Sequence, residues 1–127
     1  NMASNLTVDT LTKGATTLNT DELVDVNNTR VCKAWVNFNG TGTVAIRASY
    51  NISSITDNAA GDYTINFTTA MVDANYTVAG CLGGGNHYSL RTYEDVTPRT
   101  SSLVRIITLS ASFAFADPPQ ASFSFFR

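Results

Sequence analysis

The sequence predicts an all-β domain, an antiparallel β-sandwich of roughly six to eight short strands, with an extended N-terminal segment. From Lys33 onward, apolar and polar residues alternate, which is the period of a strand with one buried face. Turn residues interrupt this alternation about every ten residues, as they do in sandwiches. No segment has the helical spacing of apolar residues.

Residues 1–32 are rich in Thr, Asn and Asp, and their apolar residues are thinly spaced. Such a segment cannot bury enough apolar surface to form a core of its own. We therefore expect an extended linker, or a stem ordered by packing against other chains. The sandwich domain is predicted over residues 33–127.

The first half of the predicted domain contains three strands, over residues 34–38, 43–48 and 63–67. Asn39–Gly42 is predicted to be the turn between the first two, because glycine supplies the positive φ that hairpins require. A bent apolar stretch after residue 48 leads into a polar turn over residues 57–62. The third strand has the clearest alternation, with Tyr63, Ile65 and Phe67 on one face.

The second half contains further predicted strands over residues 76–81, 88–93, 103–109 and 121–126. Consecutive glycines make residues 83–87 a loop, since glycine loses the most backbone entropy in a regular element. Pro118 and Pro119 break the pattern, because neither can donate a hydrogen bond to a strand ladder. The last predicted strand is expected to dock into a sheet.

Only 14% of the residues are charged and the formal net charge is -2. Phosphate binding needs clustered Lys and Arg, whereas here the basic residues are scattered, so nucleic acid is not expected as a partner. No run of about 18 apolar residues exists, which argues against membrane insertion. Cys32 and Cys81 show no CxxC spacing, and we expect two free buried thiols that pair only if the fold brings them together.

No residue pattern points to catalysis, a metal or a cofactor, so the chain is not expected to be an enzyme. Two carboxylate pairs, Asp57 with Asp62 and Glu94 with Asp95, fall in polar turns where such residues normally meet water. His87 is the only histidine, so a single chain has no histidine cluster for a metal or a triad.

Trp35 allows two interpretations. A tryptophan on a strand can stack on a sugar, but a position in the core or at a subunit contact is favoured, because aromatic side chains dominate the energetics of both.

The best predicted binding site follows the glycine-rich loop and consists of Asn86, His87, Tyr88, Arg91 and Tyr93. These residue types combine adaptable hydrogen bonds with rigid amphipathic surface, as in many binding loops. The alternative is that residues 83–93 are only a long hairpin connection.

The stretch from Lys33 to Arg47, KAWVNFNGTGTVAIR, is followed by SYN at residues 49–51, ITDN at 55–58, GDYTINF at 61–67 and DANY at 73–76. In this order, these segments resemble a module found in tail fibres and related virion proteins of tailed phages, particularly marine ones. The likeness covers residues 33–79 and continues in SLVRI at 102–106 and the closing strand that ends in Phe126–Arg127.

The resemblance implies the C-terminal domain of a tail fibre or similar appendage, located in the virion and involved in host attachment. It further implies a homotrimer that contacts other virion proteins and a host surface glycan or protein. The alternative function is a secreted, monomeric carbohydrate-binding or adhesin module. Phe113 and Phe115 lie in a segment that fits a subunit contact, a distal tip or an ordinary strand.

Overall fold

The computed structural model describes residues 10–13, 16–19, 31–85, 87–95 and 97–127. The chain divides into two compact units, residues 1–31 and residues 32–127. In the first unit, β1 (Thr10–Lys13) and β2 (Thr16–Asn19) form an antiparallel hairpin. The remainder of the first unit, up to residue 30, lies outside the described residues.

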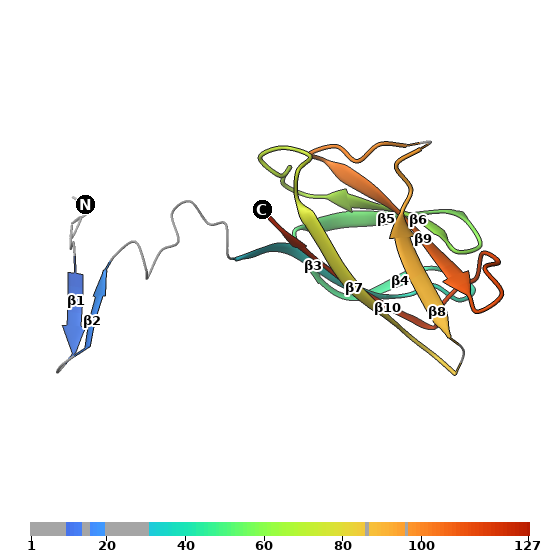
Figure 1. Cartoon of the computed structure of the whole chain (residues 1–127), viewed down its shortest axis with the longest axis horizontal. Coiled ribbons are helices and arrows are strands. Elements are labelled where there is room, and N and C mark those ends of the chain that lie inside the picture. The colour runs from blue at the N-terminus through green and yellow to red at the C-terminus, as the bar shows by residue number, and fades with distance from the viewer. Residues whose placement is uncertain (1–9, 14–15, 20–30, 86, 96) are drawn as a thin grey trace, which may run out of the picture. The chain divides into compact units, whose positions relative to one another are not determined.

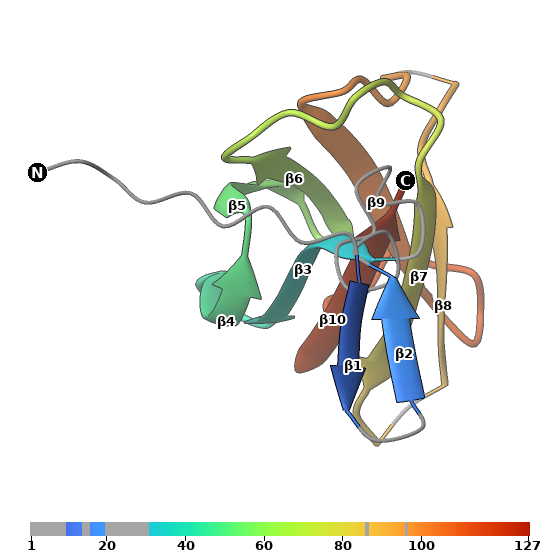
Figure 2. The same cartoon turned by 90° about the vertical axis from the view of Figure 1, so that its left-hand side faces the viewer.

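The second unit consists of two four-stranded antiparallel sheets, which confirms the predicted all-β sandwich (Figure 1). The described residues contain no helix. The first sheet has the strand order β4-β3-β10-β7, with bounds Ala45–Tyr50, Cys32–Asn39, Gln120–Phe126 and Thr77–Gly83. The second has the order β5-β6-β9-β8, with bounds Ile52–Ala59, Asp62–Phe67, Leu103–Ser110 and Tyr88–Thr92. Figure 2 shows the edge strands β4 and β5 on one side of the sandwich and β7 and β8 on the other.

The core lies between the two central pairs of strands, where alternate residues point inward. Aromatic rings join the sheets in edge-to-face pairs, with 5.2 Å between the ring centroids of Phe38 and Tyr63 and 5.0 Å between those of Phe67 and Phe125. Such pairs contribute about 0.5–1.5 kcal/mol beyond the area they bury. The alternation that predicted strands 34–38, 63–67 and 121–126 is therefore also what builds the core.

The predicted strand over residues 43–48 does form, but the one-sided burial expected of it is wrong. All six residues of β4 are exposed, and Ile46 retains 39% of its accessible surface. β4 is an edge strand, and a bulge next to Asn37 leaves Ile46 opposite Phe38. The polar turn is also shorter than predicted, because β5 runs to Ala59 and only two residues connect it to β6.

Two residues expected to be buried instead lie toward the outside of the first sheet. Trp35 is 39% exposed, so a core position in this chain is wrong for it. Cys81 is exposed and Cys32 is half-buried, and both are free thiols. β10 separates the strands that carry the two cysteines, so the sulfurs do not pair. The prediction of a buried thiol is wrong for Cys81. Its neighbours Gly80 and Leu82 face inward, so Cys81 faces outward.

The topology gives the sandwich two different ends. β3 starts and β10 finishes at what we call the root end, where Cys32 lies opposite Phe126. The β3–β4, β5–β6, β7–β8 and β9–β10 connections all lie at the opposite end, which we call the far end. Loops at the far end are therefore the part of the sandwich most distant from the point where the chain enters it.

Candidate functional site

Three of the four far-end connections are linked to one another by hydrogen bonds. The Gly40 amide donates to the Pro118 carbonyl at 3.0 Å, and the Gly61 amide donates to the Asp117 carboxylate at 2.6 Å. The Arg47 guanidinium donates to the Pro119 carbonyl at 2.7 Å. Hydrogen bonds from the β3–β4 connection, the β5–β6 connection and β4 thus hold residues 117–119 of the β9–β10 connection in place, and we call these three residues the base.

Asp117 is the centre of this base. Its carboxylate also accepts a hydrogen bond from the buried Tyr63 hydroxyl, at 2.6 Å. Burial, and then the hydrogen bond to Asp117, raise the pKa of Tyr63 far above its usual value, so the phenol remains a donor. A charge-assisted bond of this kind is about twice as strong as a neutral one.

Residues 111–116, which precede the base in the chain, turn back toward β9. The Ser110 amide donates to the Ala114 carbonyl at 2.8 Å, and the Phe113 amide donates to the Ser110 carbonyl at 3.0 Å. A single bridge joins Leu109 and Phe115. The segment is therefore a tight turn and not an ordinary strand, which settles one of the alternatives left open by the sequence.

Phe113 occupies the left-handed backbone region, with φ of 61°, and is 79% exposed, while Phe115 is 50% exposed. A bulky residue in this region costs on the order of 1–3 kcal/mol and persists only where the surroundings enforce it. Residues 111–116 contain only Ala, Ser and Phe, so this turn, which we call the aromatic turn, carries no charge. It can bind an apolar pocket or the C–H face of a sugar ring.

The structure places the predicted site residues along β8. Asn86 lies outside the described residues, and His87 is exposed in the β7–β8 connection. Tyr88 is half-buried at the far end, with its hydroxyl 3.5 Å from the Asp117 carbonyl. Arg91 is exposed in β8, whereas Tyr93 lies beyond the root end of that strand.

Tyr93 takes part in a cluster on the second sheet. The Arg105 guanidinium lies 5.0 Å from the centroid of the Tyr93 ring and forms a bidentate ion pair with the Asp62 carboxylate. The structure therefore brings His87 and Tyr88 near the aromatic turn, since Tyr88 is paired with Ser110, and leaves Tyr93 apart. Sequence reasoning did not include Phe113 in the site, although two phenylalanines just before a Pro-Pro break were a usable signal.

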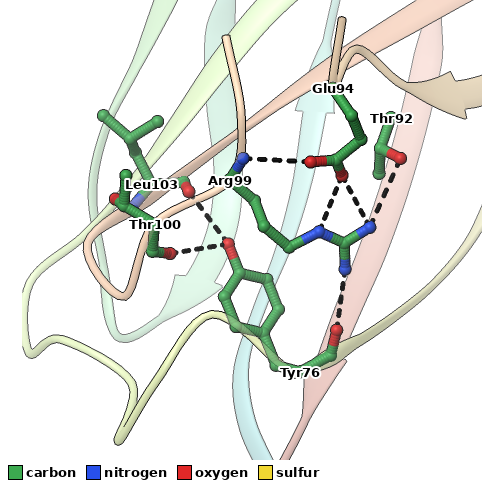
Figure 3. A network of polar contacts seen from close by, with 6 residues as sticks. All are labelled: Tyr76, Thr92, Glu94, Arg99, Thr100 and Leu103. Atoms are coloured by element: carbon green, nitrogen blue, oxygen red, sulfur yellow. Dashed lines mark hydrogen bonds and ion pairs between the residues drawn. The ribbon is translucent and has the colours of Figure 1, made fainter.

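Two of the four carboxylates considered for catalysis, Asp62 and Glu94, have structural partners. At the root end, Arg99 donates to Glu94 at 2.7 Å and to the Tyr76 carbonyl at 2.8 Å (Figure 3). Burial raises the pKa of Glu94, but hydrogen bonds from Arg99 outweigh it and bring the pKa below its usual value. The hydrogen bond from Arg105 lowers the pKa of Asp62. Both carboxylates are thus held ionised as parts of loop-fixing networks.

Within the described ranges, no three His, Cys, Asp or Glu side chains gather as a possible metal site. The same part of the chain contains no helix long and apolar enough to cross a membrane. Comparison with protein-family models, with curated proteins and with solved structures finds no match to this chain.

Proposed function

We propose that this chain is the C-terminal domain of a tail fibre or similar appendage of a tailed phage, a homotrimeric virion protein that takes part in host attachment. The sequence resemblance over residues 33–79 supports this assignment. The topology is compatible with it, because the chain enters the sandwich at the root end and its connections gather at the far end. A domain at the end of an appendage needs this arrangement to present loops to a surface.

The observation that carries the attachment role is the exposed, strained Phe113 on a rigid base. A solvated turn at φ of 61° favours Gly or Asn, and a largely exposed phenylalanine there gains nothing from burial in this chain. Residues held in an unfavourable backbone conformation cluster at binding sites. We assign the aromatic turn as the main contact and His87 with Arg91 as the flanking polar contacts.

Assembly is tested by light scattering after size-exclusion chromatography. We expect about three times the chain mass of 13.6 kDa. A single chain mass at all concentrations would contradict the proposed homotrimer and favour a monomeric adhesin or carbohydrate-binding module.

Attachment is tested with the fluorescently labelled chain and whole cells from a panel of marine bacteria, cyanobacteria included. An aromatic hot-spot residue contributes about 2 kcal/mol or more and such contributions are not additive, so Phe113→Ala with Phe115→Ala should lower cell binding at least about 30-fold, the loss of one such residue. The same variant should keep the wild-type oligomeric mass and far-ultraviolet spectrum. His87→Ala with Arg91→Ala tests the flanking contacts and is expected to have a smaller effect.

Two controls separate binding from folding. Ser112→Ala on the same turn should bind cells like the wild type. Phe113→Gly relieves the backbone strain and should leave the free energy of unfolding within about 1 kcal/mol, yet lose binding. Full cell binding by the double phenylalanine variant would remove the aromatic turn as the attachment site.

A further inference from the structure

The dipeptide Asn39–Gly40 lies where β3 ends and the β3–β4 connection begins. An asparagine followed by glycine is the pair most prone to deamidation, because glycine has no side chain to shield its amide nitrogen. That nitrogen attacks the asparagine Cγ and ammonia leaves, and water then opens the succinimide ring to aspartate or isoaspartate. The sequence contains this pair once.

The packing of the far end requires the glycine of this pair. A Cβ at position 40 would lie 2.5 Å from the Tyr63 hydroxyl oxygen and 2.9 Å from the Pro118 carbonyl oxygen. Tyr63 is fully buried and the Pro118 oxygen belongs to the backbone, so neither can move aside cheaply. The close approach of the β3–β4 connection to the base therefore imposes a reactive dipeptide on the chain.

In the folded chain, both reacting groups are held by other contacts. The Gly40 amide is buried and donates to the Pro118 carbonyl at 3.0 Å, which keeps its proton from bases in solution. The Asn39 side-chain nitrogen donates to the Thr41 carbonyl at 2.7 Å, and the Asn39 side-chain oxygen accepts from the Thr41 hydroxyl at 2.8 Å. Asn39 is also paired with Ala45, which restrains the backbone rotation that ring closure requires.

We propose that Asn39 is a deamidation site that reacts only when the end of β3 separates locally from the base. Native chains open in parts without unfolding as a whole, and the rate of a reaction in the open form follows the population of that form. The opening must break the bond from Gly40 to Pro118 and release the Asn39 side chain from Thr41. The site follows from these contacts alone and does not depend on the attachment role.

Either product of the reaction would weaken the same contacts. In aspartate, a carboxylate oxygen replaces the nitrogen that now donates to the Thr41 carbonyl at 2.7 Å, so an attraction becomes a repulsion. In isoaspartate, the main chain before Gly40 is one carbon longer, which displaces the Gly40 amide from the Pro118 carbonyl. Deamidation would therefore loosen the base permanently.

The test follows the deamidation of Asn39 by peptide mass spectrometry in mildly alkaline buffer. The folded chain should react at least about 100-fold more slowly than the same chain unfolded in urea. Tyr63→Phe removes the hydroxyl that donates to the Gly40 carbonyl at 3.3 Å and to Asp117, and it should speed the reaction of the folded chain about tenfold. Thr41→Val, at an exposed position, frees the Asn39 side-chain oxygen and should speed it about threefold or more.

Tyr76→Phe is the matched control, because it removes a buried hydroxyl at the root end, where Tyr76 donates to the carbonyls of Thr100 and Leu103. It should leave the rate at Asn39 unchanged in the folded chain. In urea, all variants should react at one common rate, since the intrinsic reactivity belongs to the dipeptide. Equal acceleration by Tyr63→Phe and Tyr76→Phe would assign the reaction to unfolding of the whole domain and overturn the proposal. A folded wild-type chain that reacts as fast as the unfolded one would also overturn it.

Discussion

Gly61→Ala is expected to destabilise the chain by about 2–5 kcal/mol, the sum of the left-handed strain and the clash of the added methyl group. Gly61 has φ of 64°, and an alanine Cβ there would lie 2.5 Å from the Thr108 carbonyl oxygen and 2.6 Å from the Ala116 amide nitrogen. Both obstacles are backbone atoms, so β9 and the β9–β10 connection must move. The movement would break the bond from the Thr108 amide to the Gly61 carbonyl, now 2.8 Å. Denaturant unfolding at fixed protein concentration measures the loss.

Gly42→Ala is the matched control for this prediction. Gly42 has nearly the same φ, 66°, but nothing lies within 4 Å of the position its Cβ would take. Its substitution should therefore cost only the left-handed strain, about 1–2 kcal/mol. Equal losses for the two variants would mean that the close approach of β9 and the aromatic turn to Gly61 does not constrain the fold.

Alkaline pH is expected to unfold the chain steeply because two buried phenols must remain protonated. Burial is the main cause that raises the pKa of Tyr76 to about 12, and burial together with Asp117 raises that of Tyr63 still further. A folded pKa above the unfolded value of about 10 gives stability that is complete below pH 10 and is lost as pH rises. Between about pH 10 and 12 the loss approaches roughly 3 kcal/mol per pH unit for the two residues together. That is a large share of a typical stability of about 5–15 kcal/mol.

Tyrosine variants isolate this effect. Tyr63→Phe should reduce the slope of unfolding free energy against pH by about half, and a double variant that adds Tyr76→Phe should nearly remove it. At neutral pH, Tyr63→Phe should also cost about 1–3 kcal/mol, because the Asp117 carboxylate loses its phenol donor. An unchanged alkaline slope in the double variant would contradict the assignment.

The fold could be predicted because its signal is local. Alternation in residues 34–38, 63–67 and 121–126 coincides with full burial of every second residue. The same pattern over residues 43–48 predicted a buried face that does not form, because burial also depends on whether a strand is central or at an edge. Periodicity carries no information on that placement, nor on the bulge beside Asn37 that shifts the register.

The candidate site was predictable only in part. A glycine-rich loop beside polar and aromatic residues indicated the far end through His87 and Tyr88. The sequence could not show that Tyr93 would lie under Arg105, since that contact joins residues twelve positions apart through the pairing of β8 with β9. Phe113 was missed as a site residue because its left-handed backbone conformation, which makes it unusual, is one that phenylalanine rarely adopts and that its residue type therefore does not predict.

The antiparallel pairing of β3 with β10 has a mechanical consequence. Tension applied between Cys32 at the root end and a ligand held by the aromatic turn acts along the strands, because both points lie at strand ends. The ladder bonds of β3 with β4 and β10 then share the load in shear and do not open one after another. A domain pulled in this direction resists stretching far better than one peeled from its edge, which suits the attachment role that we propose.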